Sequence, residues 1–436
     1  MRDFGRSDNP AVQAQLDRLA ALSLPQGRLG LDTIRALMER LGNPHRALPP
    51  TFHVAGTNGK GSTCAFLRAM LEAEGYRVHV TTSPHLVRYN ERIRLAGELI
   101  SDAMLADVLE EVLDAGEDLG PSFFEVTIAA AFLAFSRTPA DACVVEVGMG
   151  GRFDATNVVG PEVLAACGIA ALGLDHERFL LAPEEGVPKE PMARIAFEKA
   201  GIAKRSVPLV SIARPPLEAA SIAAVAREKG ASLLVQGEDW EAFAFDGGLA
   251  YSDQAGGAGK QGMNLGPPAL PGAHQIENAG LAIAMLRHQS MIEVGYRAFS
   301  AGLQNARWPA RMQRLSPGPL TGRREVWLDG GHNPQAGAML GAHFRDKRLH
   351  LVIGMIEGKD PASLIGPLGP ALASITAVPV PGHDWHPASA FGPAAQPAPD
   401  LASALAMIPH DGLPVLIAGS LYLAGEVLRL NDELPD

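Results

Sequence analysis

Cysteine, long apolar runs and basic charge are all scarce in this 436-residue chain. The three cysteines, Cys64, Cys143 and Cys167, lie in apolar stretches, which is typical of buried thiols in a reducing compartment rather than of a disulfide framework. The longest apolar run, residues 126–135, is too short to cross a bilayer, which takes about 20 residues. The first residues lack the apolar core and cleavage site of a signal peptide. We therefore expect a cytoplasmic protein.

Basic side chains are outnumbered by acidic ones. Lys and Arg total 37 against 48 for Asp and Glu, which gives a formal net charge of −11. Affinity for nucleic acids and for anionic membranes comes from Lys and Arg, so we expect neither as a partner. Small phosphate ligands stay possible, because backbone N–H groups and one or two cations can hold them.

The length and the hydrophobic pattern predict two α/β domains. A single core rarely grows beyond about 250–300 residues, and short apolar β-branched runs alternate here with helical segments, which favours mostly parallel sheets. Residues 253–271 are predicted to form a loop or a hairpin, and residues 388–400 are predicted to form a loop. The predicted strands are 52–55, 77–81, 142–147, 164–169, 208–212, 232–235, 326–328, 349–354, 377–380 and 415–418, with helices at 62–74 and 276–287 among others.

A glycine-rich turn follows the first predicted strand, in the order strand, turn, lysine, hydroxyl, helix. Backbone N–H groups and a helix N-terminus form a positive cup for phosphates, Lys60 adds a charge, and the hydroxyl of Ser62 can reach Mg²⁺. The strict P-loop pattern is not met, because Gly56 lies only three residues before Gly59 and Gly61 follows the lysine. The candidate ATP-binding residues are Gly56, Thr57, Asn58, Gly59, Lys60, Gly61 and Ser62.

The loop AGTNGKGST resembles the ATP loop of the Mur-ligase superfamily, and its glycine after the lysine is similar to the folylpolyglutamate and dihydrofolate synthase branch. TSPHLVRYNERI at 82–93, VVEVGMGGRFDATN at 144–157 and LDH at 174–176 resemble the same branch. The resemblance implies a P-loop N-terminal domain at 1–303, a linker at 304–312 and a smaller Rossmann-like α/β domain at 313–436. It also implies a monomeric ligase that uses ATP to join L-glutamate to a folate or dihydropteroate carboxylate through an acyl phosphate.

A magnesium site is implied at the ends of several predicted strands. Ser83, Glu146 and His176 follow such ends and could converge, because ligands gather outside the carboxyl ends of parallel strands. A hydroxyl and a carboxylate suit Mg²⁺, whereas histidine is an unusual ligand for it, so His176 rests on the resemblance. Together with Ser62 these residues are the expected metal ligands. The alternative for a lone strand-end glutamate is a capping or salt-bridge role.

Lys199 lies in FEKAGI, which resembles the family motif with a carbamylated lysine whose new carboxylate supports the metal site. Only a neutral amine captures CO₂, and burial lowers the pKa of lysine. The alternative is an ordinary surface helix lysine. With Lys60, His176 and Arg311, Lys199 completes the set of expected catalytic residues.

The acceptor pocket is expected around a flat pterin ring. Phe124 would stack on the ring and the Asp154 carboxylate would face its N–H groups; a core aromatic and a helix N-cap are the alternatives. Arg28 stands where relatives often carry Asp, so the chain could extend folates, make dihydrofolate, or do both. The expected acceptor contacts are Leu29, Phe124, Glu125, Phe153, Asp154 and Ala155.

Three segments after residue 270 resemble the family's remaining ATP contacts. They supply Asn278 in LPGAHQIENA, Arg311 in RWPARMQ with Ala310 in place of glycine, and Asp329 and His332 in DGGHNP. The segment 180–191 is longer than the family's usual loop, and HDWH at 383–386 is interpreted as a solvated loop.

Two other functions are less consistent with these motifs. A Mur-type amino-acid ligase with a nucleotide-sugar acceptor is disfavoured by Gly61 and by the 82–93 segment. A P-loop protein that only hydrolyses or senses ATP would leave Lys199, Asn278 and Arg311 without a role.

Overall fold

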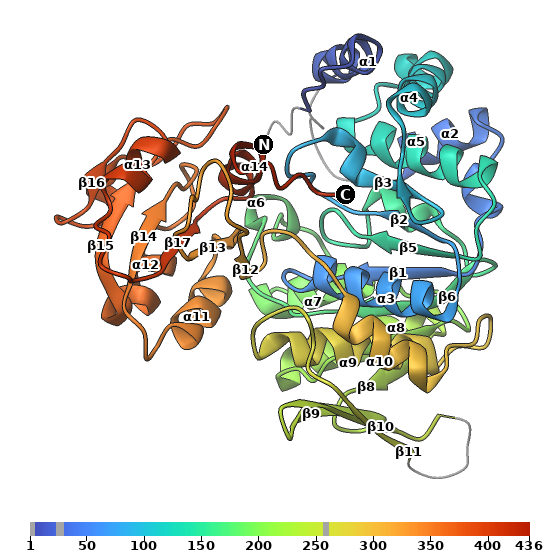
Figure 1. The fold of residues 1–436 in the computed structure, drawn as a ribbon. Helices are drawn as coiled ribbons and strands as arrows, with labels where there is room; N and C mark the ends of the chain where they lie inside the picture. The colour runs from blue at the N-terminus through green and yellow to red at the C-terminus, as the bar shows by residue number, and fades with distance from the viewer. Residues whose placement is uncertain (1–4, 23–29, 256–260) are drawn as a thin grey trace. The chain divides into compact units, whose positions relative to one another are not determined.

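The computed structural model describes residues 5–22, 30–255 and 261–436 and divides into two compact units (Figure 1). The larger unit holds the described residues up to Ala269 together with Gln275–Arg307, and the smaller unit holds Leu270–His274 with Trp308–Asp436. Each unit has its own sheet. The predicted class, α/β with two mostly parallel sheets, is confirmed.

The larger unit is built on an eight-stranded sheet in the order β4-β3-β2-β5-β1-β6-β7-β8. All neighbours pair in parallel except β2 with β3 and β3 with β4. The central strands of this sheet, β2, β5, β1 and β6, are buried along their whole length, as parallel strands covered on both faces require. The strands are β1 (Thr51–Ala55), β2 (Val78–Thr81), β3 (Ile93–Leu95), β4 (Glu98–Leu99), β5 (Ala142–Glu146), β6 (Leu164–Ile169), β7 (Pro208–Ser211) and β8 (Ser232–Val235).

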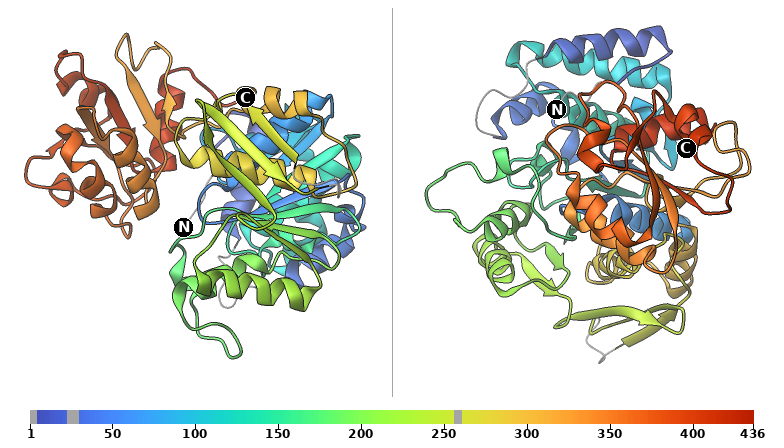
Figure 2. Two further views of the ribbon diagram at one scale, coloured as in Figure 1. Left: turned by 90° about the horizontal axis from the view of Figure 1, so that it is seen from below. Right: turned by 90° about the vertical axis from the view of Figure 1, so that its left-hand side faces the viewer.

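Helices cover both faces of this sheet (Figures 1 and 2). One face carries α5 (Phe123–Arg137), α7 (Pro191–Ala200) and α8 (Pro216–Lys229), whose apolar residues share one core. The other face carries α3 (Lys60–Glu74), which packs against α10 (Tyr296–Asn305). The remaining helices of the unit are α1 (Pro10–Ala21), α2 (Asp32–Arg40), α4 (Asp102–Gly116), α6 (Glu177–Leu180) and α9 (His274–Arg287), with 3-10 helices at Pro44–Arg46, Tyr89–Arg92, Glu117–Leu119 and Ala155–Val158.

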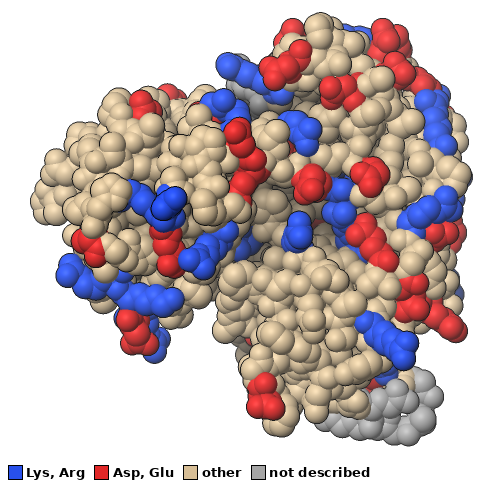
Figure 3. All heavy atoms as spheres, viewed as in Figure 1, with Lys and Arg blue, Asp and Glu red and all other residues tan. Residues whose placement is uncertain are grey.

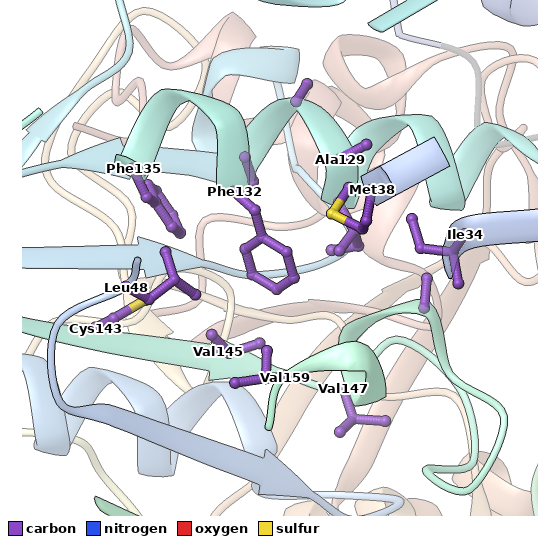
Figure 4. Packing of buried hydrophobic residues seen from close by; sticks show 14 of the residues in the cluster. Ile34, Met38, Leu48, Ala129, Phe132, Phe135, Cys143, Val145, Val147 and Val159 are labelled. Carbon is purple, nitrogen blue, oxygen red and sulfur yellow. The ribbon is translucent and has the colours of Figure 1, made fainter. Parts of the chain in front are cut away.

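The core between α5 and the sheet is mainly apolar, with the buried His79 of β2 stacked on Phe135. Phe132 and Phe135 of α5 point toward Cys143 and Val145 of β5 (Figure 4), and all four side chains are buried. Burial of one such aromatic side chain contributes about 1.5–3 kcal/mol. The three cysteines are free and buried, as the sequence predicts, and burial raises the pKa of the thiols of Cys143 and Cys167.

A three-stranded antiparallel sheet, β9 (Trp240–Phe245), β10 (Gly248–Asp253) and β11 (Gln261–Leu265), adjoins α9. A Cβ added at Gly280 of α9 would lie 2.4 Å from the Cβ of Ala242, so helix and sheet are in close contact. Part of the segment predicted as a loop or hairpin is therefore strand, because β11 pairs with β10 over its whole length.

The smaller unit has a six-stranded sheet in the order β12-β13-β17-β14-β15-β16, parallel except for β12. Leu340 of α11 and Phe344, the residue that follows this helix, share a core with Leu364 and Leu368 of α12 on one face. The other face is covered by α13 and α14. The elements are β12 (Gln313–Arg314), β13 (Val326–Asp329), β14 (Leu349–Ile353), β15 (Leu372–Ala377), β16 (Gln396–Pro397), β17 (Val415–Ala418), α11 (Pro334–His343), α12 (Ala362–Leu368), α13 (Leu401–Met407) and α14 (Leu421–Leu430), with 3-10 helices at Gly369–Ala371 and Ala388–Phe391.

Two local predictions for the smaller unit are wrong. The strand predicted at 377–380 lies at Leu372–Ala377 instead, because Pro379 has no N–H to donate to a ladder; the valines on either side of it are buried without being strand residues. The loop predicted at 388–400 contains a short 3-10 helix and the edge strand β16, which pairs with β15 through Thr376 and Ala377. None of the helices in the described ranges combines the length and apolar character needed to cross a membrane.

Candidate active site

The glycine turn connects β1 to α3 and is tied to the chain that follows β6. The N–H groups of Thr57 and Asn58 both donate to the carbonyl of Ala171, at 2.7 and 3.1 Å. The hydroxyl of Thr57 donates to the carbonyl of Gly173 at 2.9 Å. These two N–H groups are used inside the protein, so the phosphate cup is the first turn of α3, whose N–H groups have no acceptors within the helix.

Gly59 needs to be glycine for two reasons. Its φ of 81° lies in the left-handed region, which other residues rarely adopt, and a Cβ there would lie 2.3 Å from Oδ1 of Asn278. Asn278 is buried in α9 and donates through Nδ2 to Oε1 of Gln275 at 2.9 Å. Gln275 in turn donates to Oγ of Ser62 at 3.4 Å. The predicted ATP contacts Gly59, Ser62 and Asn278 are therefore in one place.

Gln275 was missed by sequence reasoning. It is spaced three residues before Asn278 on a helix, so the two side chains share one face, and that spacing was the available signal. Lys60, at the first position of α3, lies with Nζ 3.5 Å from the carbonyl of Thr57, directly over the turn.

Lys199 is buried, not a surface lysine. It belongs to α7, is 4% exposed, and donates from Nζ to the carbonyl of Gly56 at 2.9 Å. Burial, reinforced by the nearby positive charge of Lys60, lowers the pKa of Lys199 to about 7. A substantial fraction of this amine is therefore neutral near pH 7, which is the form that reacts with CO₂.

Ser83 and Glu146 meet at the carboxyl ends of β2 and β5, which are neighbours in the sheet. The N–H of Ser83 donates to Oε2 of Glu146 at 3.1 Å, and Glu146 is buried. His176 lies three residues beyond Gly173, the residue that Thr57 binds. Its φ is 52°, and its Nε2 lies 3.8 Å from Oδ2 of Asp175.

The described residues contain no group of three or more His, Cys, Asp or Glu side chains that could hold a metal ion by itself. The donors present at this edge of the sheet are mainly oxygens, from the hydroxyls of Ser62 and Ser83 and the carboxylate of Glu146. A sparse oxygen set suits Mg²⁺, which keeps several waters and is commonly completed by substrate phosphates. The residues therefore fit a magnesium–nucleotide site.

The predicted acceptor residues Phe124 and Glu125 lie in the first turn of α5. The ring of Phe124 packs on the backbone after β5, where a Cβ added at Gly148 would lie 2.4 Å from the ring. Glu125 forms a capping box with Ser122: Oε2 of Glu125 accepts from the N–H and the hydroxyl of Ser122, at 2.8 and 2.7 Å. The sequence Ser-Phe-Phe-Glu carries that signature, so a structural role for Glu125 could have been predicted.

Asp154 is the N-cap of the 3-10 helix Ala155–Val158, which is the alternative role expected for it. The side chain accepts from the N–H groups of Thr156 and Met149, at 3.0 and 2.7 Å. Burial raises the pKa of Asp154, and these hydrogen bonds oppose the shift. Ala155 is buried beside it, and Phe153 is partly buried against the core. Leu29 and Arg28 lie outside the described residues.

In the smaller unit, Asp329 organises the turn that carries the other predicted ATP contacts. Its carboxylate accepts from the N–H groups of Met312 and Gly331, at 2.9 and 2.7 Å. Burial raises the pKa of Asp329, and the charge of Arg311 opposes this. His332 is oriented by a contact of 3.1 Å between Nδ1 and the carbonyl of Gly330. Ala310 has a φ of 55°, the conformation that a glycine adopts without strain.

Comparison with known proteins finds relatives along most of the chain. No family model matches it. It is 37% identical over 341 residues to the dihydrofolate synthase/folylpolyglutamate synthase of Escherichia coli strain K12, across 77% of this chain and 74% of that protein. It is 33% identical over 358 residues to the protein of the same name from Bacillus subtilis strain 168, across 77% of each chain.

The solved structures agree with these relatives. E. coli FolC in complex with DHPP and ADP is 31% identical, with a TM-score of 0.84 over 98% of both chains. A bifunctional folylpolyglutamate synthase/dihydrofolate synthase with Mn, AMPPNP and L-glutamate bound is 30% identical, with a TM-score of 0.82 over 98% of this chain and 99% of that one. Sequence identity and fold together lead to one conclusion: the chain belongs to the folylpolyglutamate synthase/dihydrofolate synthase family.

Proposed function

We propose that this protein is an ATP-dependent ligase that joins L-glutamate to the carboxylate of a folate or of dihydropteroate. The observation that carries the proposal is the contact between the phosphate turn and Lys199, where an amine with a pKa of about 7 touches Gly56. This second, buried lysine at the turn favours a ligase over a protein that only binds or hydrolyses ATP, which would leave it without a role. The names of the relatives supply the reaction class.

The phosphates of ATP would be held by the first turn of α3 and by Lys60. Asn278 would contact the nucleotide from α9. We assign Arg311, Asp329 and His332 to ATP and glutamate binding, and the ordered turn around Asp329 supports this. Gly56, Thr57, Asn58, Gly59 and Gly61 shape the turn.

A divalent cation such as Mg²⁺ would be held by Ser62, Ser83, Glu146 and His176, and when bound it would neutralise charge on the phosphates. We further propose that the neutral amine of Lys199 adds to CO₂: an N–C bond forms, a proton is released, and the resulting carbamate places a negative charge next to the cation site. The depressed pKa of Lys199 supports this.

Glutamate addition would proceed in two transfers. A carboxylate oxygen of the acceptor forms a bond to the γ-phosphorus of ATP, the bond to the bridging oxygen breaks, and ADP leaves. The amine of glutamate then forms a bond to the acyl carbon, phosphate leaves with the former carboxylate oxygen, and a proton is lost from nitrogen. Lys60 and Arg311 would stabilise the charge on the transferring group. Phe124, Phe153 and Ala155 would line the acceptor, with Asp154 and Glu125 holding their loops in place.

We expect the protein to act as a monomer in the cytoplasm, without nucleic-acid or membrane partners. Lys and Arg side chains are interspersed with Asp and Glu on the face in Figure 3, rather than gathered into a basic field. The mixed charges on this face and the net charge of −11 support this expectation.

The test of the proposed function is the mass of the product. Purified protein is incubated with Mg-ATP, L-glutamate and either dihydropteroate or a tetrahydrofolate, and the products are analysed by mass spectrometry. We expect glutamylated product and phosphate release that requires both glutamate and the acceptor. If phosphate is released at the same rate when glutamate or the acceptor is left out, the ligase assignment is rejected. Comparison of the two acceptors distinguishes the two ligase activities.

A further inference from the structure

The segment between α6 and α7, residues 181–190, has no regular secondary structure, and we refer to it as the strap. Most of its side chains are exposed or partly exposed. Glu184 differs from its neighbour Glu185: the side chain of Glu184 is 15% exposed, whereas Glu185 is exposed to solvent. A carboxylate that turns inward from an exposed segment needs a partner.

Glu184 has two such partners. Its Oε1 and Oε2 accept from Nη1 and Nη2 of Arg152 at 3.2 and 2.6 Å, which is a fork-to-fork pair. Its Oε2 also accepts from Nη2 of Arg194 at 2.9 Å. Arg152 lies in the loop after β5 and Arg194 lies in α7, so the strap is attached to both elements.

A second carboxylate completes the cluster. Glu198 of α7 accepts from Nε and Nη2 of Arg152 at 3.1 and 2.8 Å, and it pairs with Arg194 at 2.9 Å. The side chains of these four residues are between 6% and 20% exposed. Two positive and two negative charges therefore balance in a nearly buried position, and Arg152 is held by both carboxylates at once.

Arg152 also contacts residues around the candidate site. Its guanidinium carbon lies 4.2 Å from the ring centre of Phe153 and 4.9 Å from that of Phe197, a cation–π geometry. Its backbone N–H donates to the carbonyl of Glu198 at 2.8 Å. The loop that carries Phe153 and the helix that carries Lys199 are thus joined at this arginine.

We propose that Glu184 is a positioning residue for the acceptor: by fixing Arg152 it fixes Phe153 and the loop 148–157. This rests on the proposed function, in which Phe153 contacts the acceptor. The competing explanation is a cluster that only stabilises the fold. Buried ion pairs contribute little net stability, but removal of one partner leaves the other charge buried and unpaired, which destabilises the fold. An effect on stability therefore has to be separated from an effect on positioning by experiment.

The first comparison uses Glu184→Gln and Glu185→Gln. Both changes remove one charge from adjacent positions, but only the first breaks the pairing with Arg152. We expect Glu184→Gln to raise KM for the acceptor about tenfold, the scale of effect seen when a supporting partner of a site residue is removed. KM for ATP should stay unchanged, and Glu185→Gln should match the wild type in both.

The double variant Glu184→Gln/Arg194→Gln separates positioning from stability. Glu184→Gln alone leaves two arginines facing one carboxylate and should lower Tm. Arg194→Gln removes the surplus charge and leaves the Arg152–Glu198 pair intact, so Tm should recover. The acceptor KM, and the acceptor Kd measured by calorimetry, should stay raised because Glu184 still does not hold Arg152.

Two outcomes overturn the inference alone: equal acceptor KM in Glu184→Gln and Glu185→Gln, or an acceptor KM that returns to the wild-type value together with Tm in the double variant. A wild-type protein that neither binds nor glutamylates dihydropteroate or a tetrahydrofolate overturns this inference and the proposed function together.

Discussion

At the scale of single residues, buried charge decides which side chains can do chemistry. Lys60 and Lys199 lie on the two sides of the same turn, yet Lys199 is nearly inaccessible and Lys60 is partly exposed. Lys60 is placed where it can reach bound phosphates, whereas burial lowers the pKa of Lys199 to about 7. This division of labour between two lysines gives each a distinct prediction.

Lys60→Ala should lower kcat by roughly a hundredfold or more, because a charge aimed at the transferring phosphoryl group is lost. The fold should be unaffected, since Lys60 contributes only a weak contact with Thr57. Phosphate release and thermal unfolding are both measured, and the control is Lys229→Ala, a substitution at an exposed lysine. Full activity in Lys60→Ala would contradict the assignment of the phosphate turn.

Lys199→Met should abolish activity and raise Tm at pH 7. The folded state lowers the pKa of Lys199 from 10.5 to about 7, so between these values the unfolded chain binds more protons, and wild-type stability rises as the pH rises. The methionine variant lacks this dependence. Its advantage in Tm should therefore be largest at or below pH 7 and shrink at pH 9, as followed by thermal unfolding; an advantage that is the same at both pH values would contradict the burial argument.

Ala310→Gly should stabilise the protein. Ala310 is buried with a φ of 55°, where an L-residue is strained by about 1–2 kcal/mol, while the greater freedom of glycine in the unfolded chain offsets about 0.5–1 kcal/mol. The net gain should be between zero and about 1.5 kcal/mol in urea unfolding. Ala306→Gly, at a position with a φ of −58°, is the control and should destabilise.

The sequence named candidate site residues, whereas their contacts appear only in the structure. The motif around Lys60 identified the turn, and the EKAGI motif identified Lys199. The sequence left two roles open for Asp154, because a carboxylate that faces a ligand and one that faces an N–H group look alike in sequence. For Glu125, by contrast, the capping-box spacing from Ser122 was a readable signal. Arg152 pairs with Glu184 and Glu198, which are 32 and 46 residues away in the sequence, so no local sequence pattern predicts these pairs.

At the scale of elements, the site is assembled where β1, α3 and α9 meet. The two glycines that bound α3, Gly59 and Gly75, both adopt positive φ values, of 81° and 102°. Only Gly59 is crowded: its Cβ would strike Asn278, whereas nothing lies within 4 Å of a Cβ at Gly75. The two ends of one helix therefore form a natural comparison.

Gly59→Ala should destabilise the protein more than Gly75→Ala and should also weaken ATP binding. Backbone strain of about 1–2 kcal/mol is common to both, and the difference between them reports the collision with Asn278. Urea unfolding gives the stabilities and calorimetric titration gives the affinity for Mg-ATP. Equal losses in both variants would show that α9 yields to the added methyl group.

Element prediction failed mainly where elements are short. β3, β4, β12 and β16 have two or three residues each, too few for a hydrophobic period to be visible. The strand predicted at 377–380 failed differently, since apolar valines suggested a strand that Pro379 prevents. The long apolar strands β1, β5 and β6 were predicted within one residue because burial on both faces leaves a plain signal.

At the scale of the whole molecule, two compact units with separate cores predict two unfolding events. Mg-ATP at about a hundred times its Kd should stabilise the larger unit by about 2.7 kcal/mol, because a ligand that binds only the native state shifts the equilibrium by mass action. Calorimetry measures the transitions, and hydrogen exchange assigns them to peptides. Lys60→Ala should remove the shift; a single transition without ATP would contradict independent units.

The hydrogen bond from Lys199 to Gly56 has one more consequence. A carbamate nitrogen keeps one N–H, so reaction with CO₂ leaves a hydrogen available for the carbonyl of Gly56. The local charge would then change from positive or neutral to negative while the tether to the turn survives. Carbamylation of Lys199 would thus add a carboxylate without requiring the backbone of the glycine turn to move.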